Sequence, residues 1–423
     1  MRAGTRTRPA PWPAEFLENG AETRTRDSII GPGYHPCFRV TRKGGLSMIS
    51  SLKISGYRAF DRFEMADLGR VNLLVGGNNS GKTSILEGLY ILASASNATA
   101  LWQVLARRGE QIVPEPTSNR GVQAEADVSH LFHGHEISPG TELSLSTTND
   151  SPSRSVKYRI DAVKPEEHPH LVAQFADEGL TGPRLALWIS GAPDYALPPL
   201  ILSRLGTLRV EILQQFINVR SPKSEAGNAQ YVTTESLNVA QISQLWNSIV
   251  LTPDEERVIK ALQVLEKRVE RIAQVQTGLI QYPGQGFLLP SRGGFFVKLA
   301  DNDKRIPIGS FGDGVWRMLA LVVALVRAKD SLLLIDEIDT GLHYTVMEDM
   351  WRLVYEAAEL FNVQVFATTH SYDCVHSLAA VCRDTSNERG AITIQRIEAT
   401  KKKATAFTEA QVRLIAEREI EVR

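Results

Sequence analysis

The sequence has no excess of either charge, few cysteines and no long apolar run. Lys and Arg number 47 against 48 Asp and Glu, so the net charge is −1 and the composition does not indicate a nucleic-acid-binding protein. Cys37, Cys374 and Cys382 show no paired spacing, which argues against a disulfide framework and a zinc ribbon. No apolar run reaches the roughly 20 residues that span a bilayer, and the first residues lack the apolar segment of a secretory signal. We therefore expect a cytoplasmic protein that does not enter a membrane.

Residues 1–47 differ from the rest of the chain, because prolines and arginines are scattered through them without any hydrophobic period. We interpret this segment as a disordered tail. Met48 stands directly before the first ordered pattern, so the sequence leaves open whether translation begins there.

A glycine-rich loop lies between a predicted strand and a predicted helix. Residues 48–60 and 71–77 are each expected to form one strand, and a helix is expected from Lys82. The loop, Gly76-Gly77-Asn78-Asn79-Ser80-Gly81-Lys82-Thr83, matches G-x-x-x-x-G-K-[ST] and is followed by Ser84. This spacing predicts backbone N–H groups around phosphate oxygens, a lysine beside the β- and γ-phosphates, a hydroxyl for Mg²⁺ and a helix N-terminus behind them. The alternative, a plain glycine-rich turn, is disfavoured by the strand–loop–helix setting.

Two adjacent carboxylates, Asp336 and Glu337, follow an apolar segment that predicts a buried strand over residues 332–335. Asp336 is placed to hold Mg²⁺ through water, and Glu337 to polarise the water that attacks a phosphate. Carboxylates at the end of a buried strand are costly unless a cation or donor faces them. The alternative is an ordinary exit from strand to loop.

Two further segments are weaker signals on their own. Ser310, Gly312 and Gly314 directly precede a predicted helix, where small residues can form an anion site, although glycine-rich helix starts are common. His370 follows a predicted strand over residues 363–368, and a lone histidine at such a place is commonly structural.

Together, the segments "ISGYRAF…LLVGGNNSGKTSILEGLY", "GSFGDG", "LLLIDEIDTGLH" and "ATTHS" resemble the ATPases grouped with RecF, SMC heads and OLD-type defence proteins. The resemblance is closest to stand-alone bacterial ATPases of the OLD-like group that carry no TOPRIM domain. It covers about residues 48–95 and 252–423, in the same order. It implies an α/β P-loop NTPase of the ABC-head type, with a mainly parallel sheet, an antiparallel β-lobe and a mixed α/β insertion.

The resemblance also implies roles for the weaker segments. Ser310, Gly312 and Gly314 would belong to the signature loop, which reaches across a dimer to the partner's γ-phosphate. His370 would be the switch histidine, acting in catalysis with Glu337.

Two departures from the family pattern are present. The D-loop would be Asp339–His343, with His343 in place of the usual aspartate. Gly312 and Asp313 stand where transporters of this class have serine and glycine, so a hydroxyl could come only from Ser310. Gln123 is the candidate for the Q-loop glutamine, although a surface glutamine is the favoured interpretation of this residue.

We therefore expect four segments: a tail (1–47), the first part of the ATPase head (48–110), the β-lobe with an irregular insertion (111–250) and the second part of the head (251–423). Hairpins are expected over residues 141–163, around Asp301–Asp303 and around Lys401–Lys403. Thr252 and Glu255 predict the start of a helix. One continuous helix is expected to place six apolar residues on one face, namely Val258, Ile259, Leu262, Leu265, Val269 and Ile272.

Three other groups of residues could be mistaken for sites. His130, His133, His135 and Glu136 could resemble a metal cluster, but their spacing fits neither a zinc helix nor a ribbon. Asp301 and Asp303 are interpreted as turn residues rather than a nuclease motif. Lys401–Lys403 are interpreted as a solvated turn, with contact to DNA phosphate as the alternative.

The predicted function is ATP binding and hydrolysis, with ATP and Mg²⁺ as ligands and a homodimer that forms on ATP binding. We expect this ATPase to drive a DNA-related or anti-phage process through a separate nuclease or other effector, and direct DNA binding stays open. The alternatives are a non-catalytic ATP-dependent dimerisation switch and an ABC transporter subunit. The wide separation of Lys82 from Asp336 argues against a transporter subunit.

Overall fold

The structure is a computed structural model. It describes residues 48–94, 98–112, 125–148, 153–164, 166, 184–191, 195–203, 205–210, 212, 229–233, 239–263, 266–275, 280–282, 286–288, 294–384 and 391–418. All of these fall within one unit, Gly45–Arg423. The predicted tail and Gln123 lie outside the described residues.

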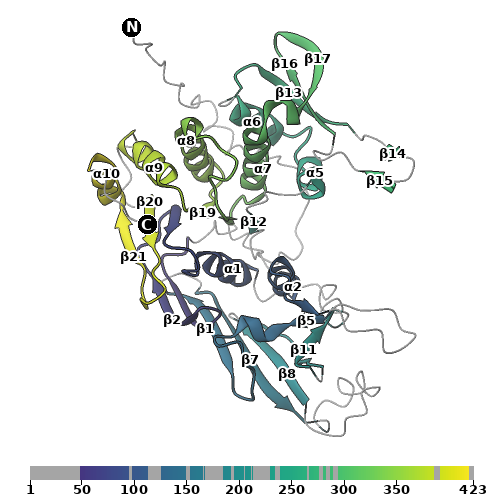
Figure 1. Ribbon diagram of the computed structural model, residues 1–423, viewed down its shortest axis with the longest axis vertical. Helices are drawn as coiled ribbons and strands as arrows, with labels where there is room; N and C mark the ends of the chain where they lie inside the picture. Colours follow the sequence, from purple (N-terminus) through teal and green to yellow (C-terminus); the bar gives the residue numbers. More distant parts are fainter. Residues whose placement is uncertain are drawn as a thin grey trace, which may run out of the picture. The chain divides into compact units, whose positions relative to one another are not determined.

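A six-stranded sheet connects the two halves of the chain (Figure 1). In spatial order its strands are β12 (Gln230–Val232), β18 (Leu332–Ile335), β19 (Gln364–Thr368), β3 (Val71–Val75), β20 (Ile392–Arg396) and β21 (Thr405–Thr408). Neighbouring strands are parallel except β20 and β21, which are antiparallel. The early strand β3 therefore lies between two strands from the end of the chain.

Both faces of this sheet are covered, so almost every residue of its inner strands is buried. Leu73 and Val75 of β3 face a core that contains α7 (Asp313–Arg327), α8 (Tyr344–Leu360) and α9 (Tyr372–Asp384). Leu74 faces the opposite core, which contains α1 (Lys82–Ala93). Side chains alternate across a strand, so consecutive residues serve different cores. Figure 1 shows α1 on the side opposite α7, α8 and α9.

A second, antiparallel sheet packs against α1. Its strands in order are β10 (Leu200–Ile201), β8 (Arg184–Gly191), β7 (Ser155–Val163), β6 (Glu142–Thr147), β1 (Leu52–Tyr57) and β2 (Phe60–Met65), with β9 (Tyr195–Ala196) on β8. The pairing of β6 with β7 confirms the predicted hairpin. The parallel sheet and this antiparallel lobe confirm the predicted fold class.

Smaller elements complete the described residues. They are α2 (Ala98–Arg107), the sheet of β4 (Gln111–Ile112), β5 (Glu125–Asp127) and β11 (Thr207–Arg209), α5 (Val239–Asn247), α6 (Pro253–Leu262), the sheet of β13 (Val269–Gln274), β16 (Phe295–Leu299) and β17 (Asn302–Pro307), the pair β14 (Ile280–Tyr282) and β15 (Gly286–Leu288), and α10 (Glu409–Glu417). Short 3₁₀ helices cover Val128–Leu131 and Ile308–Phe311.

The long helix predicted from residue 253 to residue 272 is wrong. α6 ends at Leu262, and Val269 and Ile272 belong to strand β13. A spacing of three suits one face of a helix, but the register between β13 and β16 shifts between Val269 and Arg271. This irregularity places both residues in the core, although a regular strand repeats every two residues.

The segment before the glycine-rich loop holds two strands where one was predicted. Its residues 52–65 form the β1–β2 hairpin, which turns at Arg58 with φ of 48°. A non-glycine residue with positive φ is uncommon, so a turn at this position could not be foreseen. The hairpins around residues 301 and 401 are confirmed by the pairs β16–β17 and β20–β21.

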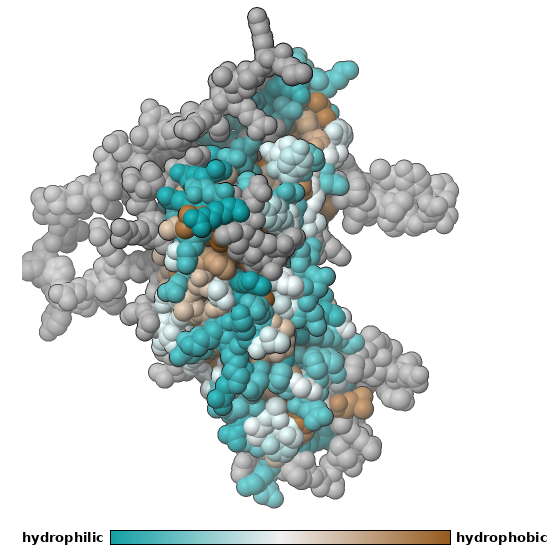
Figure 2. All heavy atoms as spheres, turned by 60° about the vertical axis from the view of Figure 1, so that its left-hand side comes forward, coloured by the Kyte–Doolittle hydropathy of each residue, from teal (hydrophilic) through white to brown (hydrophobic). Residues whose placement is uncertain are grey.

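On the face shown in Figure 2, hydrophilic residues predominate among those described, and hydrophobic residues are interspersed between them. In the described part of the chain, the large exposed hydrophobic residues are few: Met48, Leu205, Leu251, Tyr344 and Leu414. Among the described residues, no helix combines the length and the apolar character needed to cross a membrane.

Candidate nucleotide-binding site

The glycine-rich loop Gly76–Thr83, called the phosphate loop below, joins β3 to α1 and is enclosed by neighbouring chain segments. A Cβ atom on Gly76 would lie 2.2 Å from the carbonyl oxygen of Ile397. One on Gly81 would lie 2.3 Å from the ring of Phe60, and Gly81 has φ of 95°. These two positions therefore require glycine, both for space and for backbone conformation.

Lys82 is buried at the start of α1, and its Nζ donates hydrogen bonds to the carbonyl oxygens of Gly76 and Gly77 at 2.8 Å each. Burial lowers the pKa of Lys82, while Asp336 and Glu337 act in the opposite direction. Ser80 Oγ is also buried and has no hydrogen-bond partner among the described residues. An ammonium group satisfied only by carbonyl oxygens and an unpaired buried hydroxyl fit a site that receives phosphate oxygens.

Asp336 and Thr83 come together although they lie far apart in the sequence. Asp336 follows β18, and Thr83 Oγ1 lies 3.2 Å from its Oδ1 and 3.1 Å from its Oδ2. Hydroxyl and carboxylate oxygens are the ligands that Mg²⁺ prefers. The two residues that the sequence predicts as the metal site are thus adjacent, and their chemistry fits the ion.

Glu337 has a strained backbone. Its φ is 47°, its side chain accepts a hydrogen bond from Thr340 Oγ1 at 3.2 Å, and its amide N–H donates to Thr368 Oγ1 at 2.8 Å. A non-glycine residue in this region costs of order 1–3 kcal/mol and persists where the surroundings hold it, often at functional sites.

The phosphate loop, Asp336 and His370 lie at one edge of the parallel sheet. β3, β18 and β19 run in the same direction, so their carboxyl ends lie together. Ligands of open parallel sheets bind outside this edge. His370 follows β19 and lines one cavity together with Lys82 and Thr83.

This cavity, called the phosphate-loop cavity below, has a volume of about 630 Å³, within the usual range for a small-molecule site. The predicted residues in its wall are Asn79, Ser80, Gly81, Lys82, Thr83, Ser84 and His370. The other predicted residues are not in this wall, namely Gly76, Gly77, Asn78, Asp336 and Glu337. Gly76 and Gly77 contact Lys82 of the wall, and Asp336 contacts Thr83.

The predicted signature residues lie elsewhere in the chain. Ser310, Gly312 and Gly314, all within the described part of the protein, are not in the wall of the phosphate-loop cavity. They lead into α7 and lie beside the predicted D-loop, since a Cβ on Gly314 would be 3.7 Å from the carbonyl oxygen of Gly341.

Arg317 links α7 to the acidic pair. Its guanidinium donates to the carbonyl oxygens of Thr233 at 2.7 Å, Asp336 at 3.2 Å and Glu337 at 3.0 Å. Burial lowers the pKa of Arg317 to about 10, and the group stays charged at neutral pH. The sequence analysis did not identify this residue, because an arginine inside an otherwise apolar helix carries no recognisable motif.

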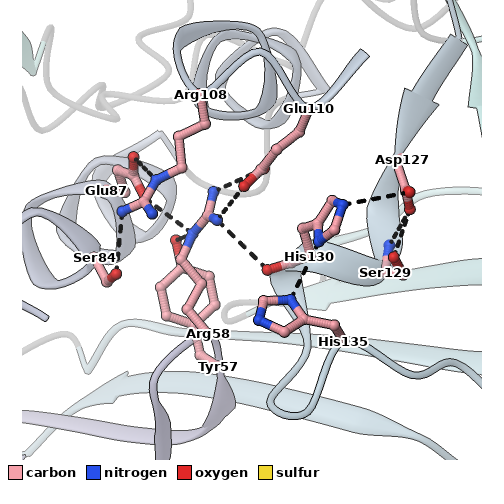
Figure 3. Close-up of polar contacts among 10 residues, drawn as sticks. All are labelled: Tyr57, Arg58, Ser84, Glu87, Arg108, Glu110, Asp127, Ser129, His130 and His135. Carbon is pink, nitrogen blue, oxygen red and sulfur yellow. Dashed lines mark hydrogen bonds and ion pairs between the residues drawn. The ribbon is translucent and has the colours of Figure 1, made fainter. Parts of the chain in front are cut away.

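The cavity wall also contains residues that were not predicted from the sequence, among them Arg58, Arg108 and Glu110. Figure 3 shows how they meet around Glu87 of α1. Arg58 Nε lies 2.9 Å and Arg108 Nε 2.7 Å from the carboxylate of Glu87, and Arg58 Nη1 lies 2.7 Å from Glu110. Arg108 also donates to Ser84 at 3.2 Å. This ion-pair network therefore braces α1 behind the phosphate loop.

Two of the histidines considered as a metal cluster form part of the cavity wall. His133 and His135 line the cavity, and His133 Nδ1 lies 2.8 Å from the carbonyl oxygen of Arg58. His130 and His135 face each other with their Nδ1 atoms 3.2 Å apart (Figure 3). Among the described residues, no group of three or more His, Cys, Asp or Glu residues could hold a metal ion.

The two remaining groups of charged residues form local contacts. Asp301 lies in the turn between β16 and β17 and pairs with Arg268 at 3.2 Å. In the turn between β20 and β21, Lys401 pairs with Glu398 at 2.8 Å and Lys403 with Glu64 at 3.4 Å.

Two family models match the chain in separate regions. One, described as "AAA ATPase domain", matches residues 48–156. The other, described as "AAA domain, putative AbiEii toxin, Type IV TA system", matches residues 213–373. The first region contains the phosphate loop, and the second contains Asp336, Glu337 and His370.

Similar proteins are found among characterised sequences. An ATP/GTP phosphatase of Helicobacter pylori is 22% identical over 359 residues, which are 80% of this chain and 89% of that protein. The DNA replication and repair protein RecF of Bacillus thuringiensis is 35% identical over 49 residues, only 12% of this chain and 13% of RecF.

Solved structures with similar folds include heads of SMC proteins. An SMC head bound to the C-terminal winged-helix domain of ScpA gives a TM-score of 0.46 at 13% identity and covers 85% of this chain and 98% of its own. The SMC head domain of Thermotoga maritima gives a TM-score of 0.40 at 12% identity, with the same coverage of 85% and 98%.

Proposed function

We propose that this chain, an ATP-hydrolysing enzyme of the RecF- and SMC-like ABC class, binds ATP with Mg²⁺ at the phosphate loop and completes each site with a second copy of itself. The proposal of a dimer rests on the position of Ser310, Gly312 and Gly314. They form a small-residue helix start, yet they lie outside the wall of the phosphate-loop cavity of their own chain. A second chain could supply the same residues to that cavity.

Each residue of the site then has a defined task. Lys82 gives up its two carbonyl contacts for phosphate oxygens, and the N-terminus of α1 stabilises their charge. Thr83 and Asp336 hold Mg²⁺, which would supply positive charge beside the β- and γ-phosphates. Glu337 accepts the proton of the attacking water, and His370 donates from the cavity wall to the reacting phosphate.

We further propose a role in a DNA-related or defence process through a separate effector protein. Two similarities support it: the description of one matching family names a toxin of a toxin–antitoxin system, and one similar protein is a DNA replication and repair protein. Direct contact with DNA through Lys401–Lys403 stays an alternative, since the side chains of Lys401 and Lys403 are exposed although both form ion pairs.

The deciding experiment replaces Glu337 by glutamine. We expect Glu337→Gln to bind ATP, to hydrolyse it at least about 100-fold more slowly than the parent, as the loss of a general base implies, and to accumulate as an ATP-bound dimer. Light scattering after size-exclusion chromatography with and without Mg-ATP measures the dimer, and phosphate release measures hydrolysis.

The control is the parent protein under the same conditions. A Glu337→Gln protein that binds ATP but stays monomeric at saturating Mg-ATP, beside a parent that hydrolyses ATP, would contradict the shared-site proposal. A parent without any hydrolysis would instead favour a non-catalytic switch.

A further inference from the structure

Thr368, the last residue of β19, contacts both acidic residues of the site. Its Oγ1 donates a hydrogen bond to Asp336 Oδ1 at 2.6 Å and accepts one from the amide of Glu337 at 2.8 Å. The residue is 1% exposed. A hydroxyl has one hydrogen to donate and lone pairs to accept, so both capacities are used on the acidic pair.

The parallel register explains why Thr368 lies there. Ile335 of β18 pairs with Ala367 of β19, so the next residues, Asp336 and Thr368, lie side by side at the carboxyl ends of the two strands. The carbonyl oxygen of Thr368 also accepts the amide of Ile338 at 3.0 Å. One residue therefore holds the side chain of Asp336 and the backbone on both sides of the strained Glu337.

The contact with Asp336 also restricts how that carboxylate can face Thr83. Thr83 Oγ1 lies within 3.2 Å of both carboxylate oxygens, whereas Thr368 contacts only Oδ1. A short hydrogen bond to a carboxylate is stronger than one between neutral groups. Without it, Asp336 could rotate away from Thr83.

We propose that Thr368 is a positioning residue for ATP hydrolysis, whose hydroxyl orients Asp336 toward Thr83 and holds Glu337 in its strained conformation. The inference rests on the proposed function, because it assumes that Asp336 holds the metal and Glu337 the attacking water. Thr368 acts through these two residues and does not line the cavity. A threonine with a merely structural role would affect stability but not the response to Mg²⁺.

The test replaces Thr368 by valine, which keeps the shape and removes the hydroxyl, and by serine, which keeps the hydroxyl. Thr393 provides the matched control: it is 3% exposed on β20 of the same sheet, and its hydroxyl donates to Asn72 Oδ1 at 2.9 Å. Thr393→Val thus removes an equally buried hydroxyl that does not reach the acidic pair.

We expect Thr368→Val to lower kcat by about 10- to 100-fold, because this is the effect expected when one hydrogen bond to a charged group is lost. The Mg²⁺ concentration for half-maximal hydrolysis should rise several-fold, while ATP binding measured in EDTA stays within about twofold of the parent. Thr368→Ser should restore most of kcat, and Thr393→Val should match the parent in its response to Mg²⁺.

The inference is overturned if Thr368→Val responds to Mg²⁺ like Thr393→Val, or if Thr368→Ser is as impaired as Thr368→Val. Should the valine variant fail to fold, Thr368→Cys replaces it, because a thiol is a weak donor of similar size. The cysteine variant must then show an intermediate kcat. A parental kcat in this variant would overturn the inference as well. Glu337→Gln is measured alongside. Unimpaired hydrolysis by that variant would mean that the proposed function has failed, whatever Thr368 does.

Discussion

At the scale of single residues, Lys82 is the side chain whose hydrogen bonds are most clearly expected to change when nucleotide binds. Its ammonium is buried and, among the residues that the structure describes, its hydrogen bonds go to two carbonyl oxygens of its own loop. Phosphate oxygens carry more negative charge than carbonyl oxygens, so a charge-assisted contact should displace these hydrogen bonds when nucleotide binds.

We predict that Lys82→Ala abolishes measurable ATP binding in a calorimetric titration, because the variant loses the buried cation that faces the phosphates. Lys53→Ala is the control, since Lys53 is an exposed lysine of strand β1 in the antiparallel sheet and should leave the affinity unchanged. Equal ATP affinity of the Lys82 variant and the parent would remove the central assignment.

Which residues could be foreseen at this scale depended on whether they belong to a contiguous pattern. Lys82, Thr83, Asp336 and Glu337 stand in segments whose spacing alone predicts their chemistry. The structure brings Thr83 beside Asp336 as that spacing implies. Arg317 could not be foreseen, because its contacts are to backbone carbonyl oxygens that only the folded chain brings together.

At the scale of elements, α1 is held from behind by the ion-pair network around Glu87. Glu87 and Arg58 are nearly inaccessible, with side chains 2% and 4% exposed. Breaking a buried pair by removing one partner leaves the other charge without compensation, which is more costly than the loss of a surface pair.

We predict that Glu87→Ala lowers the free energy of unfolding by about 3 kcal/mol or more, the loss typical of a broken buried ion pair. Glu142→Ala is the matched control. Glu142 forms an exposed ion pair with Lys157, and the two side chains are 51% and 47% exposed, respectively. Removing this glutamate should lower the free energy of unfolding by less than about 1 kcal/mol. Chemical denaturation of both variants measures the difference, and equal losses would show that the network contributes nothing beyond surface charge.

The prediction of elements from sequence succeeded where one hydrophobic period ran without interruption. The uninterrupted apolar residues 332–335 were predicted as a strand and form β18. The prediction failed at Val269 and Ile272, because an irregular strand register reproduced the spacing of a helix. It also failed at Arg58, where a left-handed turn without glycine divides β1 from β2.

At the scale of the whole molecule, the proposed dimer makes each site depend on two chains. A chain with a defective phosphate loop can still offer its signature residues, and a chain with defective signature residues can still bind ATP. Two such chains can form one intact site between them, provided that they pair.

We predict that Lys82→Ala and Ser310→Glu are each inactive in hydrolysis, the second because its carboxylate repels the phosphates of a partner's ATP. Ser310 is exposed, so the change should not disturb its own chain. An equimolar mixture should recover a substantial part of the parental rate, measured by phosphate release. A mixture no more active than its components would argue that each chain completes its own site.

The order of strands in the central sheet has a consequence for biosynthesis. β3 carries the phosphate loop, and both of its neighbours, β19 and β20, come from residues 364–396. A ribosome makes the chain from its N-terminus, so β3 emerges long before either neighbour and must wait with both of its edges unpaired. Only when residue 396 has left the exit tunnel can the sheet close around it. The nascent protein therefore cannot acquire nucleotide early in synthesis, and chaperones would have an exposed apolar strand to protect throughout that interval.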